Sequence, residues 1–177
     1  MSENCFEGRR ARLRRLMHEK KLDALLVSQP ANRFYLSGFE LHDCQCNESS
    51  GCLVIMADGK DWLCTDSRYE EAAHALWNED RIFIYRGKTA EAVNGHLKQL
   101  APGRIGFEAE NLSFKFARVL GEGLEMEAAD GLVEKLRMVK DEEEIALIAA
   151  SVNLNHAMLD WLRPRLQPGR NEADIAW

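Results

Sequence analysis

Four residues with side chains that bind soft metal ions lie close together in the sequence: His42, Cys44, Cys46 and Cys52. Imidazole and thiolate are ligands that zinc prefers, so this segment is the first candidate for metal chemistry. The spacing is unusual for a zinc site, because one residue separates Cys44 from Cys46 where a Cys-x2-Cys knuckle has two. On an extended strand, two residues at this spacing share one face and do not surround an ion. An ordinary loop that carries thiols is the favoured interpretation, and zinc binding is the alternative.

The common catalytic and nucleotide-binding motifs are absent from the sequence. Gly121 and Gly123 lack the third glycine of a dinucleotide-binding loop, and Lys60 lacks the earlier glycine of a phosphate-binding loop. His18 is not followed by the second histidine of a zinc-peptidase helix, and no Gly-x-Ser-x-Gly elbow occurs. Local motifs therefore assign no catalytic residue.

An arginine-rich segment near the N-terminus raises the question of nucleic-acid binding. Leu13, Leu16 and Met17 follow helical spacing, which predicts an amphipathic helix from about Gly8 to Lys21 with its arginines on the outward side. The whole chain carries a net charge of −6, whereas nonspecific binding to nucleic acid depends on a surplus of positive charge. A solvated charged face is therefore favoured, and we expect no nucleic-acid partner.

Composition predicts a globular protein. The chain has 177 residues, of which 46% are hydrophobic and 29% charged, which is enough for one domain or somewhat more with its own core. No apolar run approaches the ~20 residues that span a bilayer, and the N-terminus lacks the apolar core of a signal peptide. We therefore expect a cytoplasmic protein with no membrane partner. The five cysteines are an odd number, so free thiols are expected.

The hydrophobic pattern predicts strands that alternate with helices. An Asp-Gly turn between two apolar runs predicts a β-hairpin, and the other strands are separated by helical segments. This order predicts an α/β fold: a three-layer sandwich around a mixed, mostly parallel sheet of about six strands. The strands expected are 24–28, 51–56, 62–65, 81–85, 104–107 and 124–128, and the helices between and after them are 68–77, 89–100 and 113–120.

The C-terminal segment differs from the rest of the chain. Asp141 is a suitable N-cap, and Glu144 stands where a capping box needs a glutamate. The helix that follows carries two apolar stripes, which predicts that both sides are covered by other structure. Asn171 is the expected cap of a further helix that contains only one turn. We interpret this segment as the beginning of a truncated second domain.

Five strings in order resemble the proline-peptidase and creatinase family of metalloenzymes, whose catalytic domain has the pita-bread fold. They are KLDALLVSQPANRFYLSGF at 21–39, LCTDSRYEEAA at 63–73, IGFE at 105–108, LVEKLRMVKDEEEIALI at 132–148 and PGRNEADIA at 168–176. The resemblance implies a creatinase/prolidase-like N-terminal domain over 1–130 and the start of the catalytic domain over 131–177.

The resemblance also implies a function. The chain would be the non-catalytic N-terminal domain of an Xaa-Pro aminopeptidase or dipeptidase, and would be inert alone. The family holds two divalent ions (Mn, Co or Zn) with ligands further along than this chain extends, acts on short proline-containing peptides, and is commonly dimeric. Alternatives are a creatinase-like hydrolase domain and a catalytically inactive protein-binding module.

The resemblance places the loop after residue 38 near the mouth of the active site. It makes Phe39, His42 and Asp43 the candidates for contact with substrate, with a solvent-exposed loop as the alternative. Asp66, Arg68 and Tyr69 are expected to cap and brace the following helix and not to touch substrate. The cysteine-rich loop departs from the family pattern, which leaves the substrate class and the role of its thiols open.

Overall fold

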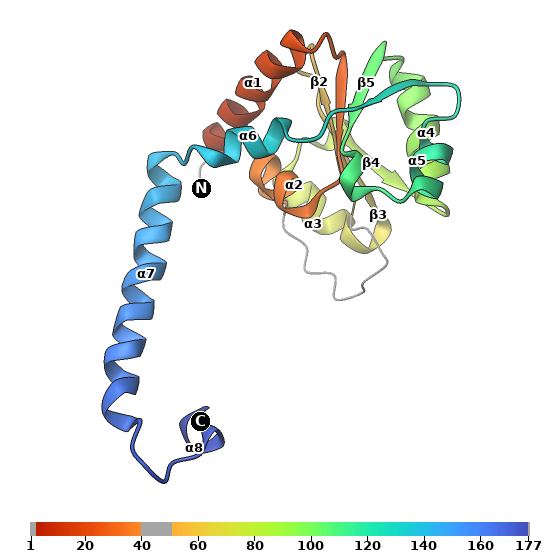
Figure 1. Ribbon diagram of the computed structural model, residues 1–177. Coiled ribbons are helices and arrows are strands. Elements are labelled where there is room, and N and C mark those ends of the chain that lie inside the picture. The colour runs from red at the N-terminus through yellow and green to blue at the C-terminus, as the bar shows by residue number, and fades with distance from the viewer. Residues whose placement is uncertain (1–2, 40–50, 177) are drawn as a thin grey trace. The chain divides into compact units, whose positions relative to one another are not determined.

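The computed structural model describes residues 3–39 and 51–176 of the chain (Figure 1). These residues belong to two compact units, Met1–Met138 and Val139–Trp177. Helix α6 (Leu132–Met138) lies in the first unit, where Leu132 and Val133 are buried. The domain boundary after residue 130 that the resemblance implies stays a prediction.

The first unit is built on a six-stranded sheet with the order β4-β3-β2-β1-β5-β6. Only β2 runs against its neighbours: β1–β2 and β2–β3 are antiparallel, whereas β1–β5, β3–β4 and β5–β6 are parallel. This confirms the predicted mixed, mostly parallel sheet. The strands are β1 (Ala24–Val27), β2 (Cys52–Met56), β3 (Trp62–Asp66), β4 (Ile82–Tyr85), β5 (Arg104–Phe107) and β6 (Glu125–Ala128).

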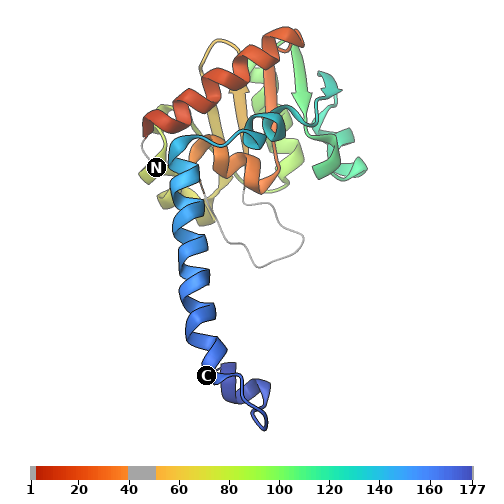
Figure 2. The same ribbon diagram turned by 60° about the vertical axis from the view of Figure 1, so that its left-hand side comes forward.

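Helices cover both faces of this sheet, which confirms the three layers (Figures 1 and 2). On one face, Leu25 and Val27 of β1 pack in a core with residues of α1, α2, α3 and α6; on the other, Leu26 packs with residues of α4 and α5. Two cores form because successive side chains of a strand point to opposite faces. The helices are α1 (Glu3–Glu19), α2 (Pro30–Ser37), α3 (Glu70–Leu76), α4 (Thr89–Leu100) and α5 (Phe114–Leu120), with 3-10 turns at Ser67–Tyr69 (η1), Glu79–Arg81 (η2) and Ala109–Asn111 (η3).

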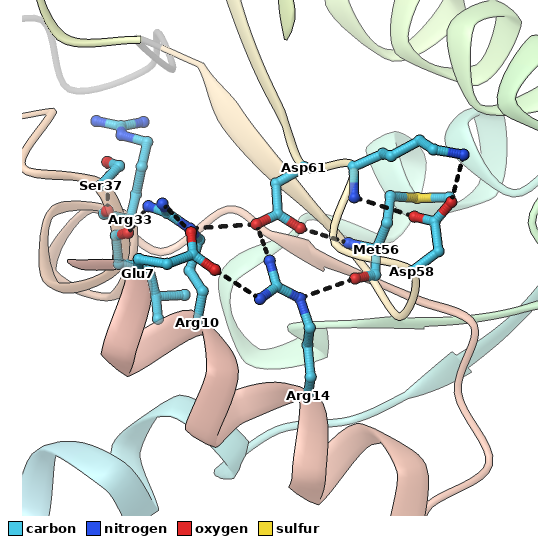
Figure 3. A network of polar contacts seen from close by, with 10 residues as sticks. Glu7, Arg10, Arg14, Arg33, Ser37, Met56, Asp58 and Asp61 are labelled. Atoms are coloured by element: carbon cyan, nitrogen blue, oxygen red, sulfur yellow. Dashed lines mark hydrogen bonds and ion pairs between the residues drawn. The ribbon is translucent and has the colours of Figure 1, made fainter. Parts of the chain in front are cut away.

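The prediction that the arginines of α1 all point outward is wrong. Arg9 is only 1% exposed, stacks on the Tyr35 ring at 4.2 Å and donates to the Tyr35 carbonyl oxygen. Arg10 and Arg14 both pair with the buried carboxylate of Asp61, as Figure 3 shows. Burial of these guanidiniums is tolerated because carbonyl oxygens, a carboxylate and aromatic faces surround them.

Asp61 fixes the β2–β3 turn against α1. Its Oδ1 accepts from the Met56 backbone N–H at 2.9 Å, and its Oδ2 lies 3.2 Å from Arg10 Nε (Figure 3). Arg14 also donates to the Met56 carbonyl oxygen at 3.1 Å. Burial raises the pKa of Asp61 to about 6, against the opposing effects of the Met56 N–H and the two arginines. Asp61 is therefore ionised at neutral pH.

The second unit consists of the long helix α7 (Glu142–Leu162), the 3-10 turn η4 (Arg163–Arg165) and the short helix α8 (Glu172–Ala176). The predicted capping box is confirmed: Asp141 accepts from the Glu144 N–H at 2.9 Å, and Glu144 accepts from the Asp141 N–H at 3.0 Å. At α8, Asn171 Oδ1 accepts from the Asp174 N–H, as the predicted cap requires.

The segment Glu142–Arg165 is long and apolar enough to cross a membrane, by length and composition only. This finding differs from the expectation that no apolar run approaches the length of a membrane span. Amphipathic helices that pack inside larger soluble proteins meet the same criterion. The absence of a membrane partner stays a prediction.

Candidate functional site

A pocket of about 670 Å³ lies in the first unit, at one end of the strands. The carboxyl ends of β1, β3 and β4 meet there, and they contribute Ser28, Asp66 and Tyr85 to its lining. The amino end of the reversed strand β2 adds Cys52 to the same wall. Open α/β sheets commonly bind ligands outside the carboxyl ends of their strands, so this pocket is a candidate binding site.

Two charged residues of this pocket, Asp66 and Arg68, are bonded to each other. Asp66 Oδ1 accepts from the Arg68 backbone N–H at 2.9 Å, and its Oδ2 accepts from the Arg68 guanidinium at 2.7 Å. The bonds from Arg68 lower the pKa of Asp66 below its usual range. Asp66 caps the 3-10 turn η1, which leads directly into α3, whereas the N-cap of α3 itself is Tyr69, which makes no side-chain cap hydrogen bond.

A second polar cluster centres on Glu108, directly after β5. Its Oε2 accepts from the Ser28 and Gln29 backbone N–H groups, both at 2.6 Å, and its Oε1 accepts from Asn32 Nδ2 at 2.6 Å. Burial raises the pKa of Glu108, and the bonds from Asn32, Gln29 and Ser28 oppose that rise. The carboxylate thereby ties the end of β5 to the β1–α2 turn.

Asn32 extends this cluster to α6. Its Nδ2 lies 2.5 Å from a carboxylate oxygen of Glu134, and its Oδ1 accepts from Arg137 at 2.7 Å. A cavity of about 500 Å³, lined by Gln29, Glu108 and Glu134 among others, lies beside it. These hydrogen bonds join α2 to α6 and to the residue that follows β5.

Arg33 contacts Phe39 and Gly51, the residues at the two ends of the connection between α2 and β2. This side chain is 2% exposed, donates to the Gly51 carbonyl oxygen at 2.6 Å, and lies 5.9 Å from the centre of the Phe39 ring. The Phe39 N–H donates to Ser37 Oγ at 3.0 Å. Residues 39 and 51, which flank the undescribed segment, are therefore both fixed to α2.

The sequence-predicted site residues have different positions. Phe39 is 1% exposed and belongs to the core under α1 and α2. Its contact with substrate stays a prediction. His42 and Asp43 lie outside the described residues, as do Cys44 and Cys46. Cys52 is described, and it is a buried residue of β2.

A dimetal centre needs several converging carboxylate or imidazole ligands. Within residues 3–39 and 51–176, no group of three His, Cys, Asp or Glu side chains is placed to hold a metal ion. The family resemblance implies ligands for the two ions further along than this chain extends, and this implication stays a prediction.

Sequence reasoning missed the roles of Glu108, Asn32 and Arg33. All three lie inside the strings that carry the family resemblance, but only the fold brings Glu108 to Asn32, 76 residues earlier. A single charged residue directly after an apolar strand was the available signal, because such a residue must find polar partners once it is buried.

Comparison with known proteins assigns the family. Residues 9–139 match the model of the Creatinase/Prolidase N-terminal domain. Among curated proteins, the chain is 25% identical over 169 residues to the uncharacterized peptidase YqhT of Bacillus subtilis (strain 168), covering 93% of this chain and 45% of that protein. The chain thus spans about half the length of the curated relatives it matches.

Solved structures give the same result. An Xaa-Pro dipeptidase from Bacillus anthracis has the same fold, with a TM-score of 0.81 at 24% identity, over 96% of this chain and 46% of that one. The N-terminal domain of the cytoplasmic peptidase PepQ from Mycobacterium tuberculosis H37Rv is 28% identical, with a TM-score of 0.62, over 73% of this chain and 98% of that one. The family resemblance is confirmed: the chain belongs to the creatinase/prolidase N-terminal domain family.

Proposed function

We propose that this chain is the non-catalytic N-terminal domain of a dimetal Xaa-Pro aminopeptidase or dipeptidase, in which it shapes substrate access and takes part in dimerisation. The observation that carries the proposal is the family match over residues 9–139, together with curated relatives about twice as long as the chain. The chemistry would reside in the part of a longer protein that corresponds to the remaining length of those relatives.

The contacts of Arg33 support a role in substrate access. Because Arg33 binds Gly51 and lies against Phe39, both flanks of the segment that carries His42 and Asp43 are held by one buried side chain. Pre-positioned flanks lower the entropy that a substrate-contacting segment loses when it binds. We propose that His42 and Asp43 contact short proline-containing peptides, with Phe39 as the buried support of that segment.

The proposed reaction depends on two divalent ions, Mn, Co or Zn, held by the catalytic part of the longer protein. When bound, such a pair supplies a hydroxide nucleophile at neutral pH and polarises the scissile carbonyl. The described residues of this chain supply structural support instead, through the clusters around Glu108 and Asp61. We propose a cytoplasmic homodimer that binds neither nucleic acid nor membrane.

Peptidase assays test this division of roles. The chain and the longer protein would each be incubated with Mn²⁺ or Co²⁺ and a proline-containing dipeptide or tripeptide, or with creatine as the alternative substrate. We expect the longer protein to cleave an Xaa-Pro bond and the chain alone to be inactive. Activity of the chain alone would overturn the proposal, and turnover of creatine alone would favour the creatinase-like alternative.

Variants in the longer protein test the proposed contacts. H42A and D43N are expected to raise KM for peptides several-fold with a smaller effect on kcat, because they remove binding groups and not the chemistry. H74A, at an exposed position of α3, is the control and should leave both constants unchanged. Unchanged KM in H42A and D43N would remove these residues from the proposal. A longer protein that is inactive on every substrate but captures a protein partner would favour the binding-module alternative.

A further inference from the structure

Two cysteines face each other across the β2–β3 hairpin. Cys52 of β2 and Cys64 of β3 are direct partners in the antiparallel register. Both are free thiols, and both belong to the core under α4 and α5, so their side chains lie on the same face of the sheet. The pair therefore results from the register of the hairpin, which brings together two residues 12 positions apart.

This arrangement suits a disulfide. Directly opposite residues of antiparallel strands have Cα atoms about 4.5–5.5 Å apart, and disulfides join cysteines whose Cα atoms are about 4.4–6.8 Å apart. The two thiols are already within hydrogen-bonding contact, and this contact, together with burial, raises the pKa of Cys64.

The two thiols differ in access. Cys52 is 7% exposed and lines the pocket of about 670 Å³ at the carboxyl ends of β1, β3 and β4. Cys64 is fully buried. A small reagent that enters this pocket reaches Cys52 first. Cys64 is placed to attack only a sulfur atom already attached to Cys52.

We propose that Cys52 and Cys64 form a reversible redox site that low-molecular-weight disulfides, such as oxidised glutathione, convert from a dithiol to a disulfide. The Cys52 thiolate attacks the small disulfide, a bond forms between Cys52 and one of its sulfurs, and one small thiol leaves. The Cys64 thiolate then attacks Cys52 Sγ and releases the second small thiol. The protein loses two electrons, the small disulfide gains them, and the two protein protons end on the released thiols.

The second step should be the slow one. Thiolates, not thiols, are the attacking species, and the raised pKa of Cys64 keeps it protonated at neutral pH. The reaction should therefore proceed through a glutathione adduct on Cys52 and accelerate as the pH rises. The closed bond would fasten β2 to β3 next to Gly51, at the point where the chain enters the sheet.

Peptide mapping tests the proposal on the full chain. The reduced protein would be treated with oxidised glutathione, alkylated and digested with trypsin. Cys64 then lies in the peptide 61–68 and Cys52 in the peptide 34–60, so a disulfide between them links two peptides. We expect this linked pair with the bond assigned to Cys52 by fragmentation, and its complete reversal by dithiothreitol.

Three variants make the test specific. C64A should stop at the glutathione adduct on Cys52, and C52A should leave Cys64 at least about tenfold less reactive than Cys52 is in C64A. C5A, on α1, is the control and should form the bond as the wild type does. Circular dichroism establishes that each variant is folded. Three outcomes would overturn the proposal. They are linkage of Cys52 to Cys44 or Cys46, failure of the wild type to close the bond even at alkaline pH, and equal reactivity of the Cys52 and Cys64 thiols.

Discussion

Arg33 and Gly51 are joined by a buried hydrogen bond: the guanidinium donates to the carbonyl oxygen at 2.6 Å. The two residues are 18 positions apart and belong to α2 and to the approach to β2. Gly51 has a φ of 133°, a conformation that side chains with a Cβ rarely adopt. The bond therefore depends on glycine at position 51, since glycine lets the backbone turn its carbonyl toward Arg33.

The substitution G51A is expected to destabilise the protein strongly. A Cβ at this position would lie 2.2 Å from the Cys64 carbonyl oxygen, in addition to the strain of the positive φ. The control is G87A, at a positive φ of 78° but with open space around its Cβ, which should cost about 1 kcal/mol. The free energy of unfolding in urea measures both, and equal losses would show that the steric contact has no effect.

The substitution D61A should reduce stability by about 3 kcal/mol, because it leaves Arg10 and Arg14 without their buried anionic partner. The control is D58A in the same turn, which removes an exposed ion pair with Lys60 and an exposed hydrogen bond from the Lys60 N–H, and should cost about 1 kcal/mol. Urea unfolding at neutral pH compares them. Similar effects of the two variants would contradict the network in Figure 3.

The substitution E108Q should reduce stability by about 2 kcal/mol. An amide places N–H donors where the carboxylate accepts from Ser28, Gln29 and Asn32, so at least one buried donor loses its partner. The control is E110Q, an exposed position two residues away, with an expected change within about 0.5 kcal/mol. Thermal unfolding of the two variants against the wild type tests this expectation, and an unchanged midpoint for E108Q would refute it.

His96 should make the stability depend on pH. Its ring is 6% exposed, stacks on Phe83 at 4.1 Å and meets the Trp62 ring edge-on at 4.6 Å. Burial lowers the pKa of His96 below the ordinary 6.5, so the unfolded chain binds a proton first as the pH falls. Stability is therefore lost as the pH drops below about 6.5.

The variant H96F isolates this effect, because it keeps an aromatic ring and removes the titrating group. The thermal midpoint of the wild type should fall more than that of H96F between about pH 7.5 and about pH 5.5. H74Q, on the exposed side of α3, should follow the wild type. Parallel curves for the wild type and H96F would exclude His96 as the source.

The exposed apolar side chains of α7 predict association of the isolated chain. Leu147, Leu154 and Trp161 are 59%, 72% and 51% exposed, and large exposed apolar patches favour contact with other surfaces. Light scattering should show a molar mass that rises with concentration. The double variant L147E/L154E should remain monomeric, whereas N155E on the same helix should not change association. A strictly monomeric wild type at high concentration would contradict this prediction.

Local sequence signals determined most of the secondary structure. Helix Thr89–Leu100 and strand Arg104–Phe107 have the predicted bounds, because the helical period and the Pro-Gly break act within a few residues. The capping box at Asp141 follows from three neighbouring positions. The start of α1 was missed by five residues; its first turns include Phe6, whose ring lies next to Gly38, the C-cap of α2.

The sequence by itself determined the alternation of strands and helices, the mixed sheet, and the strings that identify the family. Only the tertiary structure decided that Arg9 is buried, that Glu108 holds the β1–α2 turn, and that Cys52 faces Cys64. The physical reason is the range of the interactions. Propensity, capping and hydrophobic period act between near neighbours, whereas the partner of a buried charge or thiol is set by strand order and register, which bring together residues distant in the chain.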